Sequence, residues 1–202
     1  MSKYLGPIHY RLYNKIKFQN AVVNQVIEFS EENQIVSDLK QDIEEKFGSL
    51  SDKPLEDIID ESNIHGWLQK QVSVVEYRFA YAVTSILNKD KSHIEEIKTI
   101  FFNYSKNNAE IGEEEPSYAF KYLNDKLLDG MPCDRANAIV SQEENEVIWK
   151  RNVCLHKSYW DAVGGDINVY YTLREALIKG MLHNSNLYYE RVDEVTNKIA
   201  RR

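Results

Sequence analysis

The feature that most constrains the fold is a continuous apolar stripe between Asn63 and Leu87. Apolar side chains recur there at the spacing of one helix face: Ile64, Leu68, Val72, Val75, Phe79, Val83 and Ile86. The stripe covers about seven helical turns and contains no proline. Because other elements must cover such a stripe, we expect this helix to be the central and most buried element of the chain.

Weaker helical patterns surround this central helix and predict that residues 1–131 form the helical part of the chain. We expect further helices at residues 7–30, 36–47, 51–59, 92–104 and 116–130. Pro7 and Pro116 suit the first turns of their helices, and Gly48 suits a helix end. Ser92 and Glu95 have the spacing of a capping box.

The pattern changes after Met131. Residues 138–141 and 146–150 are β-branched and aromatic runs around a polar turn, which predicts a β-hairpin. Asp166 follows two glycines and is placed to cap another helix. The tail at 187–200 fits either a helix or a strand, and a third strand would stabilise the hairpin.

The expected fold is therefore mainly α (α+β), a helical bundle with a small antiparallel hairpin or sheet in its C-terminal third. The chain of 202 residues has the length of one domain, 1–202. Its helical part covers 1–131, and the hairpin and C-terminal helices cover 132–202.

Charge and composition exclude several classes of function. The net charge of −7 argues against a nucleic-acid-binding protein, which needs clustered lysine and arginine. No segment reaches the roughly 18 apolar residues that cross a bilayer, and residues 1–10 do not form a signal peptide. We expect a cytoplasmic protein whose two cysteines are thiols or ligands rather than a disulfide.

The first candidate site is a metal centre formed by Cys133, Cys154 and His156. The hairpin between the two cysteines returns the chain to its starting edge, so we expect them to lie close together. Two thiolates and an imidazole suit zinc or another transition metal. Asp134, His9, His65 or water could complete the ligands. Two alternatives stay open: the thiols are packed as small hydrophobic groups, or Cys154 is a nucleophile.

The second candidate site is an aromatic pocket for a small molecule. Its predicted ligand-binding residues come from three segments: His9, Tyr13, Tyr159, Trp160 and Arg174. Arg174 would bind a carboxylate, and Trp160 would supply apolar area and an N–H donor. Glu76 and Arg78 lie beside the apolar stripe, and we expect both to face water.

The leading hypothesis is a cytoplasmic protein that binds a small molecule or a metal in an aromatic and Cys-His pocket beside the hairpin. The alternative is a non-catalytic helical protein that acts through interaction or self-association as a homo-oligomer.

Overall fold

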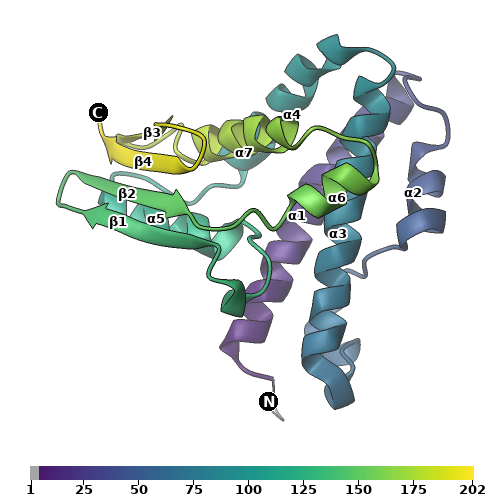
Figure 1. Ribbon diagram of the computed structural model, residues 1–202, viewed down its shortest axis with the longest axis horizontal. Helices are drawn as coiled ribbons and strands as arrows, with labels where there is room; N and C mark the ends of the chain where they lie inside the picture. Colours follow the sequence, from purple (N-terminus) through teal and green to yellow (C-terminus); the bar gives the residue numbers. More distant parts are fainter. Residues whose placement is uncertain (1–4) are drawn as a thin grey trace.

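The fold is a helical bundle with a four-stranded sheet at one end, as seen in the computed structural model, which describes residues 5–202 (Figure 1). Its helices are α1 (Pro7–Glu32), α2 (Leu39–Phe47), α3 (Ile64–Leu87), α4 (Ile94–Asn107), α5 (Pro116–Lys126), α6 (Lys157–Ala162) and α7 (Ile167–Met181). Its strands are β1 (Asn137–Gln142), β2 (Glu146–Arg151), β3 (Leu187–Arg191) and β4 (Thr196–Arg201). The mainly α fold with a small C-terminal sheet is confirmed.

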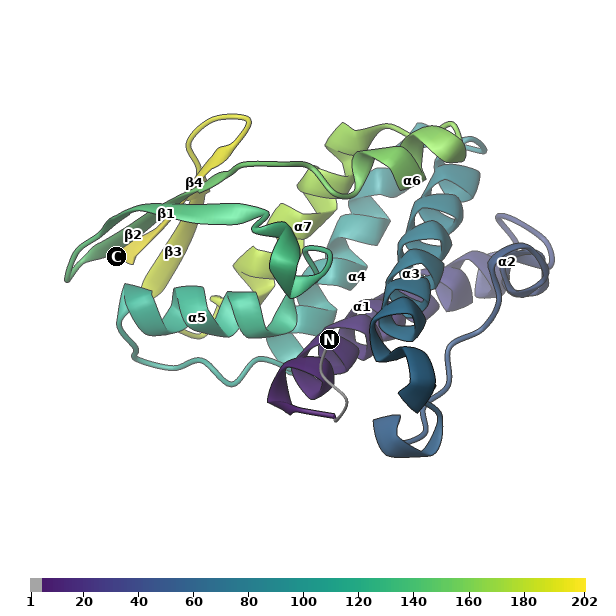
Figure 2. The same cartoon turned by 60° about the horizontal axis from the view of Figure 1, so that its bottom comes forward.

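The central helix is confirmed with nearly the predicted bounds. Helix α3 lies along α1, and α2 and α6 pack against other parts of its surface (Figures 1 and 2). Phe79, in the middle of α3, stacks on Phe101 of α4 and meets Trp160 of α6 edge to face. Apolar burial on this scale is the main force that holds such a bundle together.

The sheet has the strand order β1-β2-β4-β3, and all its neighbouring strands are antiparallel. The predicted hairpin is β1 and β2, and the tail forms two strands, of which β4 pairs with β2. Helix α5 covers one face of the sheet, where Phe120 packs against Trp149 at a ring separation of 5.1 Å (Figure 2). The tail therefore supplies the third strand that would stabilise the hairpin, and a fourth strand extends the sheet.

Local capping fixes the starts of α3 and α7 and corrects one prediction. Asp166 caps α7 as expected, because its carboxylate accepts from the backbone N–H of Asn168 at 2.8 Å. The predicted Ser92–Glu95 capping box is wrong. Asp90 caps a short 3₁₀ turn at Lys91–His93 by accepting from the N–H of Ser92, and α4 begins only at Ile94.

Two further segments are shorter than expected. The predicted helix at 51–59 is reduced to the 3₁₀ turn Leu55–Asp57, and α5 ends at Lys126 rather than near Gly130. A further pair of 3₁₀ turns covers Glu61–Asn63 and Pro132–Asp134. Among residues 5–202, no helix is both long enough and apolar enough to cross a bilayer.

Candidate functional site

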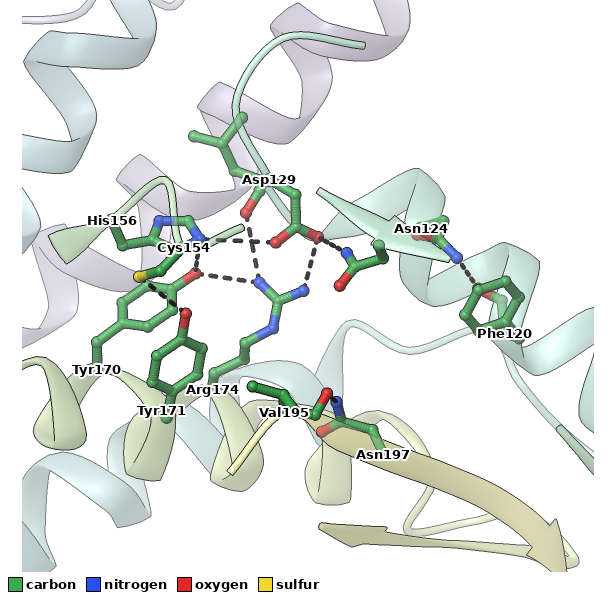
Figure 3. A network of polar contacts seen from close by, with 12 residues as sticks. Phe120, Asn124, Asp129, Cys154, His156, Tyr170, Tyr171, Arg174, Val195 and Asn197 are labelled. Atoms are coloured by element: carbon green, nitrogen blue, oxygen red, sulfur yellow. Dashed lines mark hydrogen bonds and ion pairs between the residues drawn. The ribbon is translucent and has the colours of Figure 1, made fainter. Parts of the chain in front are cut away.

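A buried network of charged side chains links α3, α7 and the segment before α6. His156 lies at its centre, and its Nδ1 is 3.0 Å from a carboxylate oxygen of Glu76. Its Nε2 lies 2.9 Å from the hydroxyl of Tyr170, and the two rings stack with centroids 4.0 Å apart (Figure 3). Glu76 and His156 are only 2% and 3% exposed, so their charges compensate each other away from water.

The network continues from Tyr170 to the loop after α5. Arg174, one turn further along α7, donates to the Tyr170 hydroxyl at 3.0 Å and to a carboxylate oxygen of Asp129 at 2.7 Å (Figure 3). Asp129 also lies 3.6 Å from Nε2 of His156 and accepts from Asn137 at 3.2 Å. The two carboxylates are thus matched by an imidazolium and a guanidinium, and the cluster is neutral as a whole.

In this network, attraction between the charged side chains changes their pKa values more than burial does. Burial would lower the pKa of His156, but Glu76 and Asp129 raise it to about 9. Burial would raise the pKa of Asp129, but Arg174 and His156 lower it to about 2. His156 is therefore a cation at neutral pH, and its two ring nitrogens are both donors.

The predicted metal centre has no support in this arrangement. Both nitrogens of His156 are occupied by protein partners, and Cys133 is exposed on the Pro132–Asp134 turn. The carboxylate of Asp134 accepts from the N–H of Met131. Among the described residues, no group of three histidine, cysteine, aspartate or glutamate side chains is placed to hold a metal ion.

The hairpin does hold its two flanks together, since Asn152 donates to the carbonyl groups of Ala136 and Arg135. Cys154 is half-buried, and the hydroxyl of Tyr171 donates to its sulfur at 3.1 Å. Burial raises the pKa of this thiol, but the hydrogen bonds from Tyr171 and from the N–H groups of His156 and Lys157 lower it overall. The closeness of the two cysteines stays a prediction.

The structure does not gather the five residues that were predicted to bind a ligand. Tyr13 donates to the carbonyl oxygens of Ser51 and Lys53, and Nδ1 of His9 accepts from the N–H of Gly6 at the start of α1. Tyr13 belongs to a separate apolar cluster at the far end of α1 and α3. These two residues therefore have structural roles away from the buried network.

The other three predicted residues, Tyr159, Trp160 and Arg174, each contact a different set of side chains. Tyr159 contacts Ser73 and Tyr77 of α3, and Trp160 is fully buried against Phe79. Trp160 lies in the wall of one pocket near the start of α7, and Arg174 lies in the wall of a different pocket beside the sheet. The carboxylate partner of Arg174 is Asp129 of the same chain.

That pocket lies between α7 and the inner face of the sheet, beside the hairpin. It encloses about 30 Å³ and is lined by Asp129, Asn137, Trp149, Arg151, Tyr171, Arg174, Ile178, Tyr189, Arg191, Glu194 and Asn197. At roughly 10–15 Å³ for each water, the space admits two or three water molecules or the head group of a small ligand. We call it the arginine pocket, after Arg151, Arg174 and Arg191.

The pocket's two strand arginines share one aromatic ring. The guanidinium carbon of Arg151 lies 3.8 Å from the ring centroid of Tyr171, and that of Arg191 lies 5.6 Å from the same centroid. Each donates to a backbone carbonyl, of Glu194 and Asp193 respectively. Within the described part of the chain, neither has a carboxylate within ion-pairing distance, whereas Arg174 is paired with Asp129.

Sequence reasoning missed most of these residues, although some signals were present. In β2, Arg151 continues the inner face of Val147 and Trp149, and in β3 Arg191 continues the face of Leu187 and Tyr189. Strand alternation would have placed both arginines on the inner face of the sheet, on the same side as these buried residues. The expectation that Glu76 and Arg78 face water is wrong, because both are buried by α1 packing along α3.

Comparisons of the chain with protein-family models, with curated protein sequences and with solved structures found no match to any of them.

Proposed function

We propose that this chain is a cytoplasmic binding protein for a small organic or inorganic anion, and that the arginine pocket holds the ligand's carboxylate or phosphate group. The observation that carries the proposal is the pair of guanidinium groups of Arg151 and Arg191, which have no carboxylate partner among residues 5–202 of an acidic chain. Arginine matches carboxylate and phosphate oxygens through paired, parallel hydrogen bonds.

The surroundings of these guanidinium groups favour an anion in three ways. Two like charges over one ring repel each other, and an anion between them relieves that repulsion. Tyr189 and Asn197 add polar groups at the wall, and Trp149 adds apolar area. The buried network fixes Arg174 and Asp129 in place, so part of the pocket is ordered before the ligand arrives.

The volume of the pocket limits the ligand. A space of about 30 Å³ takes a charged head group, and the remaining atoms of a larger ligand stay outside it. Glu194 also lines the pocket, and its negative charge disfavours ligands that carry a second negative charge beside it.

Ligand-dependent thermal stability and calorimetric titration test the proposal. The probes are inorganic phosphate and a panel of small mono- and dicarboxylates, each compared with sodium chloride at equal ionic strength. A ligand at 100 times its Kd stabilises the fold by about 2.7 kcal/mol, which corresponds to a Tm increase of roughly 5–10 °C for a chain of this size.

Matched variants test whether the ligand-dependent stabilisation comes from binding in the arginine pocket. Arg151→Gln and Arg191→Gln should each abolish most of the stabilisation, whereas Arg201→Gln on β4 removes the same charge outside the pocket and should leave it unchanged. Absence of any shift beyond that of sodium chloride, or equal losses in all three variants, would contradict the proposal.

A second candidate is self-association through the edge strand β1. Ile139 and Val140 are 49% and 64% exposed on this strand, and its outer backbone groups have no neighbouring strand within the sheet. Exposed edge strands are templates for pairing with another chain. Light scattering after size-exclusion chromatography tests this candidate: a dimer that Val140→Lys converts to a monomer supports it, and a wild-type monomer at high concentration rejects it.

A further inference from the structure

Arg78 of α3 is a buried cation that does not line the arginine pocket. It is 3% exposed, and its guanidinium group donates to Asn20, Asn24 and the carbonyl of Gly48, each at 3.1 Å. All three acceptors are uncharged. A guanidinium group has five N–H donors, so these contacts leave two of its donors available.

Among residues 5–202, Arg78 forms no ion pair with a carboxylate, although the charge of Glu44 partly offsets the lowering of its pKa by burial. A buried charge that only neutral groups contact is costly, and buried cations are normally paired with anions. Its bond to Gly48 fastens the end of α2 to α3, which is a structural role. This structural role uses one of the five N–H donors of the guanidinium group. It does not explain why a cavity lies beside that group.

Arg78 lines a cavity of about 210 Å³ between α1, α2 and the segment that follows α2. Asn20 and Asn24 are also part of its wall. The remaining polar wall is acidic, with Glu28, Glu31, Glu44 and Asp52 against the single lysine Lys40. The cavity therefore combines one buried cation with an excess of carboxylates nearer to solvent.

These charges select a particular ligand chemistry. A simple anion would compensate Arg78 but would be repelled by the four carboxylates, and a simple cation would leave Arg78 unpaired. A molecule with both groups satisfies both parts of the wall. The volume of about 210 Å³ is below that of usual drug-sized pockets, so the molecule must be small.

We propose that this cavity binds a small zwitterion of the free amino acid class, with the ligand's carboxylate on Arg78 and its ammonium group against the acidic side chains of α1 and α2. Asn20 and Asn24 hold the guanidinium plane from the side of α1 and so present its free donors in a fixed direction. The site is separate from the arginine pocket and does not depend on it.

Calorimetric titration with L-alanine, L-lysine and L-glutamate tests the proposal, with propionate and ethylamine as analogues that carry only one of alanine's charged groups. At least one amino acid should bind, and propionate and ethylamine should each bind at least tenfold more weakly than the amino acid that binds most tightly, or not at all. Binding of propionate or ethylamine as strong as that of this amino acid would overturn the proposal, and so would the absence of heat from all three amino acids.

Rim variants locate the site without disturbing the core. Glu28→Gln and Glu44→Gln should each weaken binding about tenfold or more, as expected for a lost charged hydrogen bond. Glu32→Gln, an exposed control at the end of α1, should bind like the wild type. Equal affinity of all three variants would reject the site. Arg78→Lys keeps the charge but loses the planar set of N–H donors of the guanidinium group, so it should also weaken binding. Wild-type affinity in this variant would likewise reject the site.

Discussion

Replacing Glu76 by glutamine tests whether the buried network stabilises the fold through charge. The amide has the shape of the carboxylate and can still contact Gln19 and His156, so the substitution removes charge and leaves the packing in place. After burial, Glu76 is the largest influence on the pKa of His156 and raises it. The substitution should therefore lower that pKa and destabilise the folded state at neutral pH.

The magnitude follows from linkage. Between an unfolded pKa of 6.5 and a folded pKa of about 9, protonation of His156 contributes about 3 kcal/mol. Because the folded pKa is raised, this stability is fully present below pH 6.5 and is lost as the pH rises through about 9. Glu76→Gln should cost about 2 kcal/mol near pH 6, and the cost should shrink toward zero near pH 10.

Urea unfolding across this pH range measures both quantities. The control is Glu96→Gln, because Glu96 and His93 form a similar pair at 3.7 Å on the surface, where a loss of less than about 1 kcal/mol is expected. A cost for Glu76→Gln that does not change with pH would refute the reasoning, as would a cost no larger than that of the surface control.

Three further substitutions test separate parts of the structure. Phe79→Ala should cost about 3–5 kcal/mol in urea unfolding because it opens a cavity beneath α4 and α6, and a cost under about 1 kcal/mol would show that α3 is peripheral. Tyr171→Phe removes the hydrogen bond to Cys154 but keeps the ring, so the pKa of the thiol should rise and alkylation by iodoacetamide at neutral pH should slow; unchanged kinetics would exclude that bond as a cause. Gly180→Ala places a methyl group against Ser105 where α7 crosses α4, and should cost about 1–3 kcal/mol; an unchanged urea midpoint would mean that the crossing is loose.

The sequence predicted the helices and strands well because their patterns are local. The stripe of α3 and the hairpin runs depend on residues close together in the chain, and the bounds of α3 and β2 nearly match expectation. The tail was ambiguous because Tyr188, Val192 and Val195 match the spacing of a helix, whereas the run at 188–192 also tolerates a strand. Its strand state is set by pairing with β2, more than 40 positions away.

The candidate site was predicted only in part because it depends on contacts between distant segments. Arg174 was expected to bind a carboxylate, and its partner is Asp129, which no local pattern singles out in the loop after α5. Glu76 and Arg78 were placed in water because charged residues are seldom buried without partners. Their polar partners lie mostly on α1, and only packing of α1 along α3 brings them into reach.

The arginine pocket can be tested directly by NMR of the arginine side chains. The measurement follows the guanidinium ¹⁵N resonances while inorganic phosphate or a carboxylate identified by thermal stability is added at constant ionic strength. The resonances of Arg151 and Arg191 should shift saturably and together, while that of Arg201 stays in place. Shifts that never saturate, or that are equal at Arg201 and at the two pocket arginines, would contradict binding in the arginine pocket.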